Sequence, residues 1–139
     1  MADTIPDLWP DIEQSKVVPP VAILREQAAA LGNKTGHLLE GRVITRTDED
    51  GNYIYHTFYV VAPALDNYSY NLFSISHGAE PYPVTVPHPR RMDSGRHPYP
   101  RSLEINSEKE LLDYLREVLN SEKTKRIVGS LLAQVKSET

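Results

Sequence analysis

The stretch from Tyr53 to Ala62, with the sequence YIYHTFYVVA, constrains the fold of this chain more than any other segment. It is the densest run of β-branched and aromatic residues in the sequence, and such residues favour a pleated, partly buried strand. The residues before it, DEDGN at 48–52, are a strong turn signal, because Asp50 and Gly51 can supply the two positive φ angles of a type I′ hairpin turn. We therefore expect three consecutive antiparallel strands between residues 38 and 76.

The pairing of these strands follows from their hydrophobic pattern, since a slip of one residue exchanges the two faces of a sheet. A register that places Val43 opposite Phe58, and Phe58 opposite Phe73, collects the apolar side chains on one face, which we call the core face. The same register places Tyr70 opposite Val61. The core face is then expected to hold Leu39, Val43, Ile54, Phe58, Val60, Ala62, Phe73 and Ile75.

The opposite face, which we call the outer face, is expected to be polar and partly exposed. It would hold Glu40, Arg42, Ile44, Arg46, Tyr55, Thr57, Tyr59, Val61, Tyr70, Leu72, Ser74 and Ser76. Its candidate binding residues are Arg42, Arg46, Tyr55, Tyr59 and Tyr70. Exposed aromatic rings on a sheet can stack nucleic-acid bases, and arginine can contact phosphates. The alternative is ordinary sheet stabilisation, because cross-strand pairs of this kind contribute about 0.2–1 kcal/mol each.

Three amphipathic segments predict helices around the sheet. The first begins near Pro20, because proline is tolerated where a helix amide has no partner. A capping box from Ser107 to Glu110 begins the second, and Ser121 caps the third. Their apolar stripes are Val21, Leu24, Ala28 and Leu31 in the first, Leu111, Leu112, Leu115, Val118 and Leu119 in the second, and Ile127, Val128, Leu131, Leu132 and Val135 in the third.

The sequence therefore predicts an α+β fold with the order α-β-β-β-β-(β)-α-α. An antiparallel meander of four to five strands is covered on one face by an N-terminal helix and two C-terminal helices. The fourth strand, residues 84–86, stands between Pro83 and Pro87, which indicates an edge strand because proline cannot donate to a sheet ladder. Residues 103–105 are the optional fifth strand.

Residues 1–19 predict an irregular acidic arm in front of a single α+β domain at residues 20–139. The chain has 139 residues, which is one domain by size and enough to bury a core. Trp9 is the strongest apolar anchor in the arm. We expect it to dock on its own domain rather than on a partner.

A loop rich in proline and arginine is predicted at residues 87–101. It contains four arginines against one aspartate, the most basic stretch in an otherwise acidic chain. Its candidate binding residues are His88, Arg90, Arg91, Arg96 and His97. Loops of this length in compact domains are usually either functional or disordered, and both alternatives remain open here.

The chain contains no cysteine. This excludes a disulfide scaffold, a thiol nucleophile and a cysteine-ligated metal, and it suits the reducing cytosol. The N-terminus lacks the pattern of a secretory signal, and no apolar run approaches the roughly 20 residues needed to span a bilayer. We therefore expect a cytoplasmic location and no membrane association.

The histidines match no zinc-ligand spacing, and we expect neither a metal nor a cofactor. His56 falls on the core face opposite Thr45, which predicts a hydrogen-bonded, neutral core histidine. His77, His88 and His97 lie in or near the arginine-rich loop and are the candidates for a small catalytic site. An enzymatic function is the third hypothesis, because the chain carries no G-x-S-x-G, no phosphate-binding glycine loop and no H-E-x-x-H.

Together these observations favour a small, non-catalytic binding or regulatory domain that contacts a protein partner. The acidic arm, the expected edge strand and the arginine-rich loop are the parts best suited to that contact. The net charge of −4 argues against a duplex-binding protein. Single-stranded nucleic-acid binding through the outer face is the alternative function.

Overall fold

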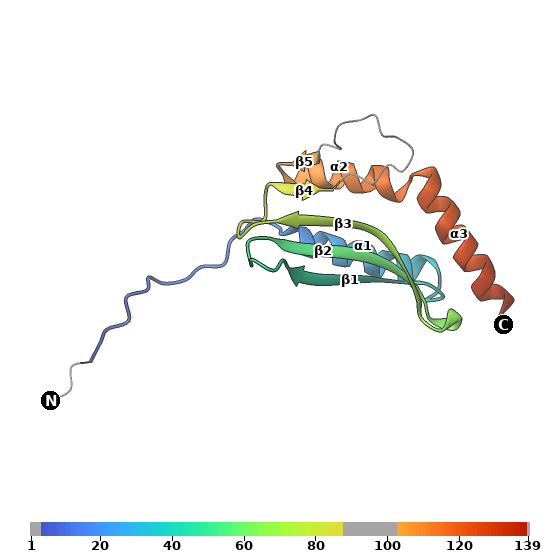
Figure 1. The fold of residues 1–139 in the computed structure, drawn as a ribbon, viewed down its shortest axis with the longest axis horizontal. Coiled ribbons are helices and arrows are strands. Elements are labelled where there is room, and N and C mark those ends of the chain that lie inside the picture. The colour runs from blue at the N-terminus through green and yellow to red at the C-terminus, as the bar shows by residue number, and fades with distance from the viewer. Residues whose placement is uncertain (1–3, 88–102, 139) are drawn as a thin grey trace.

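The computed structural model describes residues 4–87 and 103–138 and confirms the predicted α+β class (Figure 1). These residues form one antiparallel sheet with the strand order β1-β2-β3-β4-β5. The elements are α1 (Pro20–Lys34), β1 (Glu40–Thr47), β2 (Ile54–Ala62), the 3₁₀ turn η1 (Pro63–Leu65), β3 (Tyr68–His77), β4 (Val84–Val86), β5 (Leu103–Ile105), α2 (Glu108–Leu119) and α3 (Glu122–Ser137). No helix among the described residues is long and apolar enough to span a bilayer.

The hairpin of β1 and β2 has the predicted register along its whole length. Its turn differs from the prediction, because Gly51 has a positive φ of 72° whereas Asp50 does not. The N–H of Gly51 donates to the carbonyl of Asp48 at 2.9 Å. The Asp48 carboxylate also accepts from the amides of Asn52 and Tyr53. The type I′ prediction is therefore wrong, and an aspartate side chain organises the turn.

The hairpin of β2 and β3 follows the predicted register only as far as Phe58, where a β-bulge shifts the pairing. Beyond the bulge, Tyr70 pairs with Val60 and not, as predicted, with Val61. Leu72 is the extra residue that the bulge inserts into β3. Because side chains alternate between faces, Tyr70 lies on the core face, and Leu72 also packs against the core. The predicted places of both residues on the outer face are therefore wrong.

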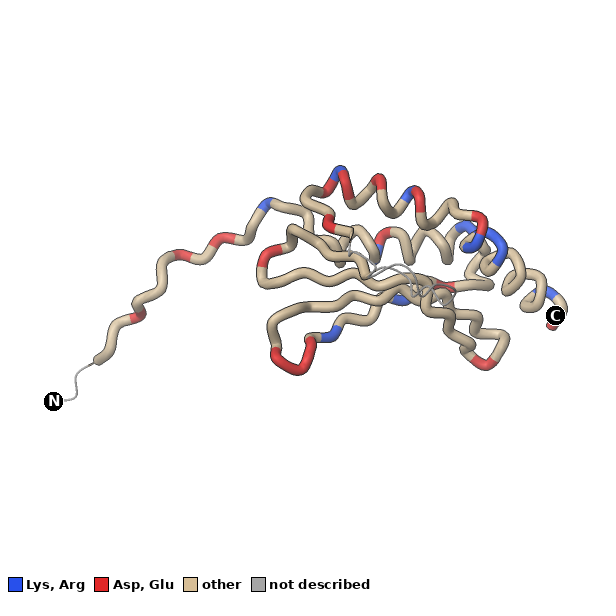
Figure 2. The backbone as a smooth tube through the Cα atoms, turned by 45° about the horizontal axis from the view of Figure 1, so that its top comes forward, with Lys and Arg blue, Asp and Glu red and all other residues tan. Residues whose placement is uncertain are grey.

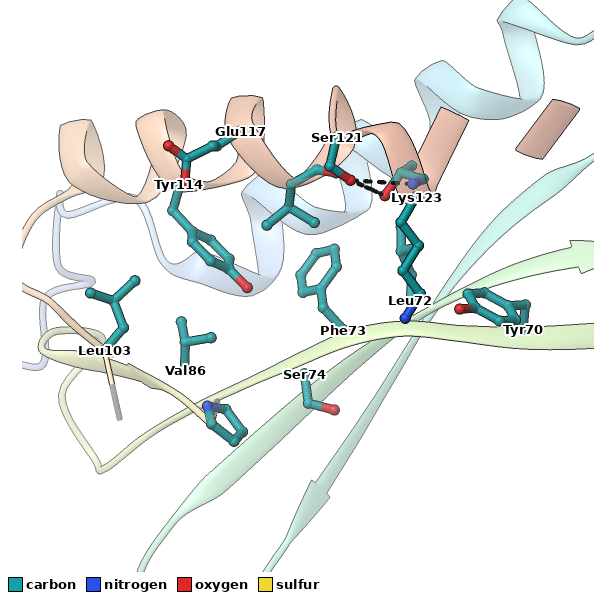
Figure 3. A pocket seen from close by; sticks show the side chains of 13 residues that line it. Tyr70, Leu72, Phe73, Ser74, Val86, Leu103, Tyr114, Glu117, Ser121 and Lys123 are labelled. Carbon is teal, nitrogen blue, oxygen red and sulfur yellow. Dashed lines mark hydrogen bonds between the residues drawn. The ribbon is translucent and has the colours of Figure 1, made fainter. Parts of the chain in front are cut away.

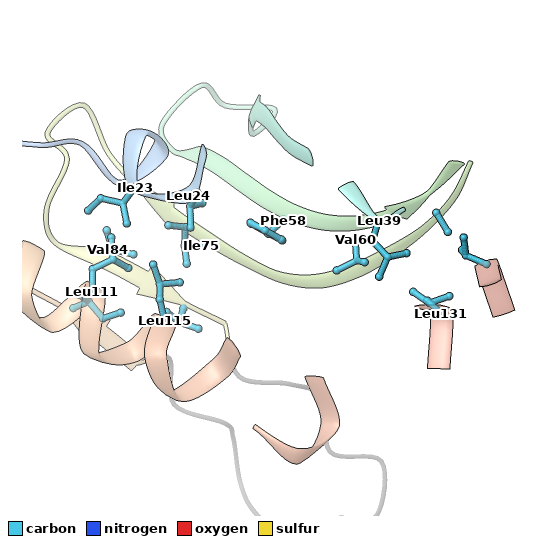
Figure 4. Packing of buried hydrophobic residues seen from close by; sticks show 14 residues of the cluster. Ile23, Leu24, Leu39, Phe58, Val60, Ile75, Val84, Leu111, Leu115 and Leu131 are labelled. Carbon is cyan, nitrogen blue, oxygen red and sulfur yellow. The ribbon is translucent and has the colours of Figure 1, made fainter. Parts of the chain in front are cut away.

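All three helices pack against the core face (Figure 4). Figure 4 shows Leu24 of α1 and Leu111 and Leu115 of α2 directed toward Ile75 of β3. The buried apolar cluster consists of Ile23, Leu24, Leu39, Phe58, Val60, Ala62, Ile75, Val84, Val86, Ile105, Leu111, Leu115, Leu131 and Val135. The core is therefore one layer between the sheet and the helices, and the outer face carries no helix of the described chain.

α1 approaches β1 at very short range, and a glycine makes this approach sterically feasible. A Cβ added to Gly41 would lie 2.5 Å from the Cα and 2.7 Å from the Cβ of Ala28. Both atoms belong to the partner helix rather than to the end of a flexible side chain, so they cannot move aside cheaply. Gly41 therefore fixes how closely α1 lies on the sheet.

β4 is an interior strand, so its prediction as an edge is wrong. It pairs with β3 through Ser76 and Thr85, and with β5 along all three of its residues. Pro83 and Pro87 stand just outside the strand, where neither has to donate to a ladder. Among the described strands, β1 and β5 form the edges of the sheet.

Candidate interaction surfaces

The N-terminal arm, residues 4–19, extends away from the domain without helix or strand (Figure 1). Four large apolar side chains of the arm are almost fully exposed: Ile5 at 84%, Leu8 at 83%, Trp9 at 76% and Ile12 at 74%. The prediction that Trp9 docks on its own domain is therefore wrong. Clustered exposed apolar side chains of this size are typical of interaction sites.

The arm combines these apolar side chains with acidic ones. Asp7, Asp11 and Glu13 are exposed between or beside them, and the amide of Trp9 donates to the Asp7 carboxylate at 3.0 Å. The base of the arm is attached to the domain, since the Tyr82 hydroxyl donates to the carbonyl of Val18 at 3.3 Å. The described part of the arm is therefore an acidic, apolar segment that is attached to the domain at its base.

The outer face brings together four of the five candidate residues predicted for it. Arg42 pairs directly with Tyr59 and Arg46 with Tyr55, as the register predicted. Both arginines and Tyr55 are exposed, whereas Tyr59 is half-buried. Two alternating pairs of a cation and a ring therefore line one open surface of β1 and β2.

Tyr70, the fifth candidate residue, lines a groove between β3 and the α2–α3 corner instead (Figure 3). This β3 groove has a volume of about 420 Å³ and a mainly apolar lining that includes Leu72 and Phe73. The rings of Phe73 and Tyr114 meet edge to face with centroids 6.2 Å apart. Burial, reinforced by the nearby Glu117 carboxylate, raises the pKa of Tyr114 above its ordinary value, so this phenol stays neutral.

The candidate residues of the arginine-rich loop lie outside the described residues. These are His88, Arg90, Arg91, Arg96 and His97. Pro87 and Leu103, the described residues on either side of that segment, both line the β3 groove.

The prediction of a neutral, hydrogen-bonded core histidine at His56 is confirmed, and a second histidine joins it. His56 Nδ1 lies 2.9 Å from the Thr45 hydroxyl, and its Nε2 lies 2.9 Å from His77 Nε2. Nδ1 of His77 lies 2.7 Å from the carbonyl oxygen of Gly78 and 3.2 Å from that of Glu80. Both imidazoles are buried, with 3% and 8% of their residues' surfaces exposed.

The carbonyl contacts determine where the protons of this pair lie. A carbonyl oxygen can only accept, so Nδ1 of His77 carries a proton and donates it. In the neutral ring Nε2 of His77 is then an acceptor, and Nε2 of His56 donates to it. The Thr45 hydroxyl completes the chain by donating to Nδ1 of His56. Burial, then the neighbouring His77 and then Arg25 lower the pKa of His56 to about 4.

The sequence interpretation grouped His77 with the loop histidines rather than with His56. The signal that identifies the pair is the alternation of β3, because His77 has the same parity as Ile75 and faces the core. Both ring nitrogens of His77 are engaged in hydrogen bonds, which does not favour it as a catalytic base. In the described ranges, no group of three or more His, Asp or Glu side chains is placed to hold a metal ion.

Fold and surfaces define an α+β domain with one helix-covered sheet face, one open sheet face and a projecting apolar arm. Comparisons with protein-family models, curated proteins and solved structures found no match to this chain.

Proposed function

We propose that this chain is a non-catalytic protein-interaction domain and that the N-terminal arm is its principal contact. The observation that carries the proposal is the nearly complete exposure of Ile5, Leu8, Trp9 and Ile12. Full burial of one such side chain contributes about 1.5–3 kcal/mol, so a partner that covers all four would gain substantial affinity. Because the chain has no cysteine, a cytoplasmic setting is part of the same proposal.

The composition of the arm indicates the kind of surface that it fits. Pro6 and Pro10 fix two φ angles and remove two amide donors, which disfavours a helix across the segment and reduces the entropy lost on binding. Asp7, Asp11 and Glu13 would meet basic side chains at the rim of the partner site. The arm is therefore suited to an apolar groove with a basic rim.

The test is affinity capture from a lysate of the native cells, with and without nuclease, using the full chain as bait. We expect wild type to retain a stoichiometric, nuclease-resistant protein that the Leu8→Ala/Trp9→Ala variant loses. The matched control is Leu112→Ala, which removes an exposed leucine from α2 and leaves the arm intact. Equal capture by the arm variant would refute the role of the arm.

The second candidate function is single-stranded nucleic-acid binding through the outer face. It is supported by the direct pairing of Arg42 with Tyr59 and of Arg46 with Tyr55 on an open sheet surface. In this case Tyr55→Ala should weaken binding of a labelled single strand, and the affinity should fall steeply with salt. Absence of binding at low salt would eliminate this candidate.

A further inference from the structure

We propose that the partner of the arm is a second copy of this chain, whose α1–α3 groove receives the arm. This inference rests on the proposed function of the arm and names its binding site. The α1–α3 groove lies above the sheet between the C-terminal half of α1 and the first turns of α3, and it has a volume of about 510 Å³. That volume falls within the range of about 300–1,000 Å³ that is typical of ligand pockets.

The α1–α3 groove is lined by apolar side chains that belong to the core or pack against it. Phe58, Val60 and Leu72 form its floor on the sheet, and Leu31 and Val128 form its walls on the two helices. Phe58 and Val60 are almost completely buried, so the accessible apolar surface of the groove comes mainly from the partly buried Leu31, Leu72 and Val128. Apolar side chains of an incoming segment would therefore be shielded from water.

The rim of this groove has the charge that the arm requires. Lys34 at the end of α1 and Lys125 near the start of α3 both line it, and none of the described residues that line it is acidic. Figure 2 shows that basic residues gather at the start of α3, whereas acidic residues are spaced along the arm. The β3 groove has one lysine, Lys123, but also Glu117, so the α1–α3 groove is the better match.

The attachment of the arm favours docking on another copy over docking on its own domain. The arm leaves the fold at the N-terminus of α1, where Pro19 and Pro20 limit the backbone and Tyr82 holds the carbonyl of Val18. The 15 residues of α1, at about 1.5 Å each, separate that point from the far end of the helix by about 20 Å. To reach its own groove, the arm would have to reverse direction at the two prolines. Two copies can instead exchange arms reciprocally, which gives a closed, two-fold symmetric dimer.

The oligomeric state and the environment of Trp9 test this arrangement on the full chain. Trp9 is the single tryptophan, so its fluorescence reports on the arm alone. We expect sedimentation to show a monomer–dimer equilibrium, and the Trp9 emission to shift to shorter wavelength as the dimer forms. Removal of residues 1–14 should give a monomer.

Gly129 offers a variant that fills the groove without loss of stability. It lines the α1–α3 groove on α3, and a Cβ placed on it meets no other atom within 4 Å. Replacement of a helical glycine also raises helix propensity, so Gly129→Leu should fold at least as well as wild type. We expect its dimer dissociation constant to rise at least about tenfold. Ala133→Leu, at an exposed position of α3, is the control and should dimerise normally.

Charge reversal supplies an independent test. Lys125→Glu should weaken the dimer, and the added Asp11→Lys change should restore part of the loss. A chain that stays monomeric with a solvent-exposed Trp9 at all concentrations would overturn the inference. So would a monomer whose Trp9 emission is shifted and depends on Gly129, because the arm would then dock on its own domain. If the chain is monomeric but still captures a protein through its arm, this inference fails and the proposed function stands.

Discussion

The buried pair of His56 and His77 makes the stability of this domain dependent on pH. An unfolded chain titrates histidine near its ordinary pKa of 6.5, whereas burial and the neighbouring His77 and Arg25 lower the folded pKa of His56 to about 4. Well above pH 6.5 His56 is neutral in both states, so it causes no pH dependence there. As the pH falls from 6.5 to 4, the unfolded state binds the proton first, so the free energy of unfolding decreases.

The size of this effect follows from the two pKa values. One unit of pKa difference corresponds to about 1.4 kcal/mol, so the complete loss below pH 4 is about 3 kcal/mol. At pH 5 linkage gives a loss of about 2 kcal/mol. That is a large fraction of the about 5–15 kcal/mol by which single domains are stable.

Urea denaturation at pH 7 and at pH 5, on wild type and on His56→Gln, measures this contribution. Carboxylates and the histidines outside this pair titrate in both proteins, so the difference between the two pH dependences reports on the His56–His77 pair. We expect wild type to lose about 2 kcal/mol more than the variant between these pH values. Thr45→Val keeps the imidazole but removes its hydroxyl partner, and should retain most of the pH dependence. Parallel curves for wild type and His56→Gln would refute the reasoning, as would an NMR titration of His56 near pH 6.5.

Three further predictions concern packing, capping and the arginine-rich loop. Gly41→Ala should lower the free energy of unfolding by about 1–3 kcal/mol, because the new methyl group overlaps Ala28. Chemical denaturation measures this loss, and unchanged stability would contradict the close approach of α1 to the sheet. Ser121→Ala should lower the free energy of unfolding by about 0.5–2 kcal/mol, because the Ser121 hydroxyl accepts a hydrogen bond from the amide of Thr124 at the start of α3. Thermal unfolding measures the loss, and restored stability in Ser121→Asp would confirm that the residue caps the helix. If the arginine-rich loop also contacts the protein partner, deletion of residues 88–100 should weaken capture of that partner while the circular dichroism spectrum stays unchanged. Full capture by the deletion variant would show that the loop is not part of the binding site.

The sequence was sufficient for the fold class and for the first hairpin, because the turn signal at Asp50 and Gly51 positions the two strands and period-two alternation excludes a slip by one residue. It was insufficient for the bulge in β3. Leu72 and Phe73 are adjacent and both apolar, so the pattern gives no sign that one of them is an extra residue. The position of Tyr70 could not be derived without that information.

The candidate interaction surfaces could be predicted from the sequence only in part. Local pairing brings Arg42 and Arg46 to their tyrosines, so the pattern of two strands was enough to predict the outer face. The position of Trp9 depends on whether the domain offers it a site, and no local pattern encodes that. β4 was taken for an edge because its flanking prolines are local signals, whereas its second neighbour, β5, comes from a distant segment.

The bulge at Leu72 also determines which sheet face Tyr70 belongs to. If β3 kept Leu72 in a regular, unbulged ladder, Leu72 would face Tyr59, Asn71 would face Val60, and Tyr70 would face Val61 on the open side. The outer face would then gain a tyrosine, and the β3 groove would lose part of its wall. Deletion of Leu72 would instead leave Tyr70 opposite Val60, so the loop side of β3 could lose its irregularity without changing the face on which Tyr70 lies.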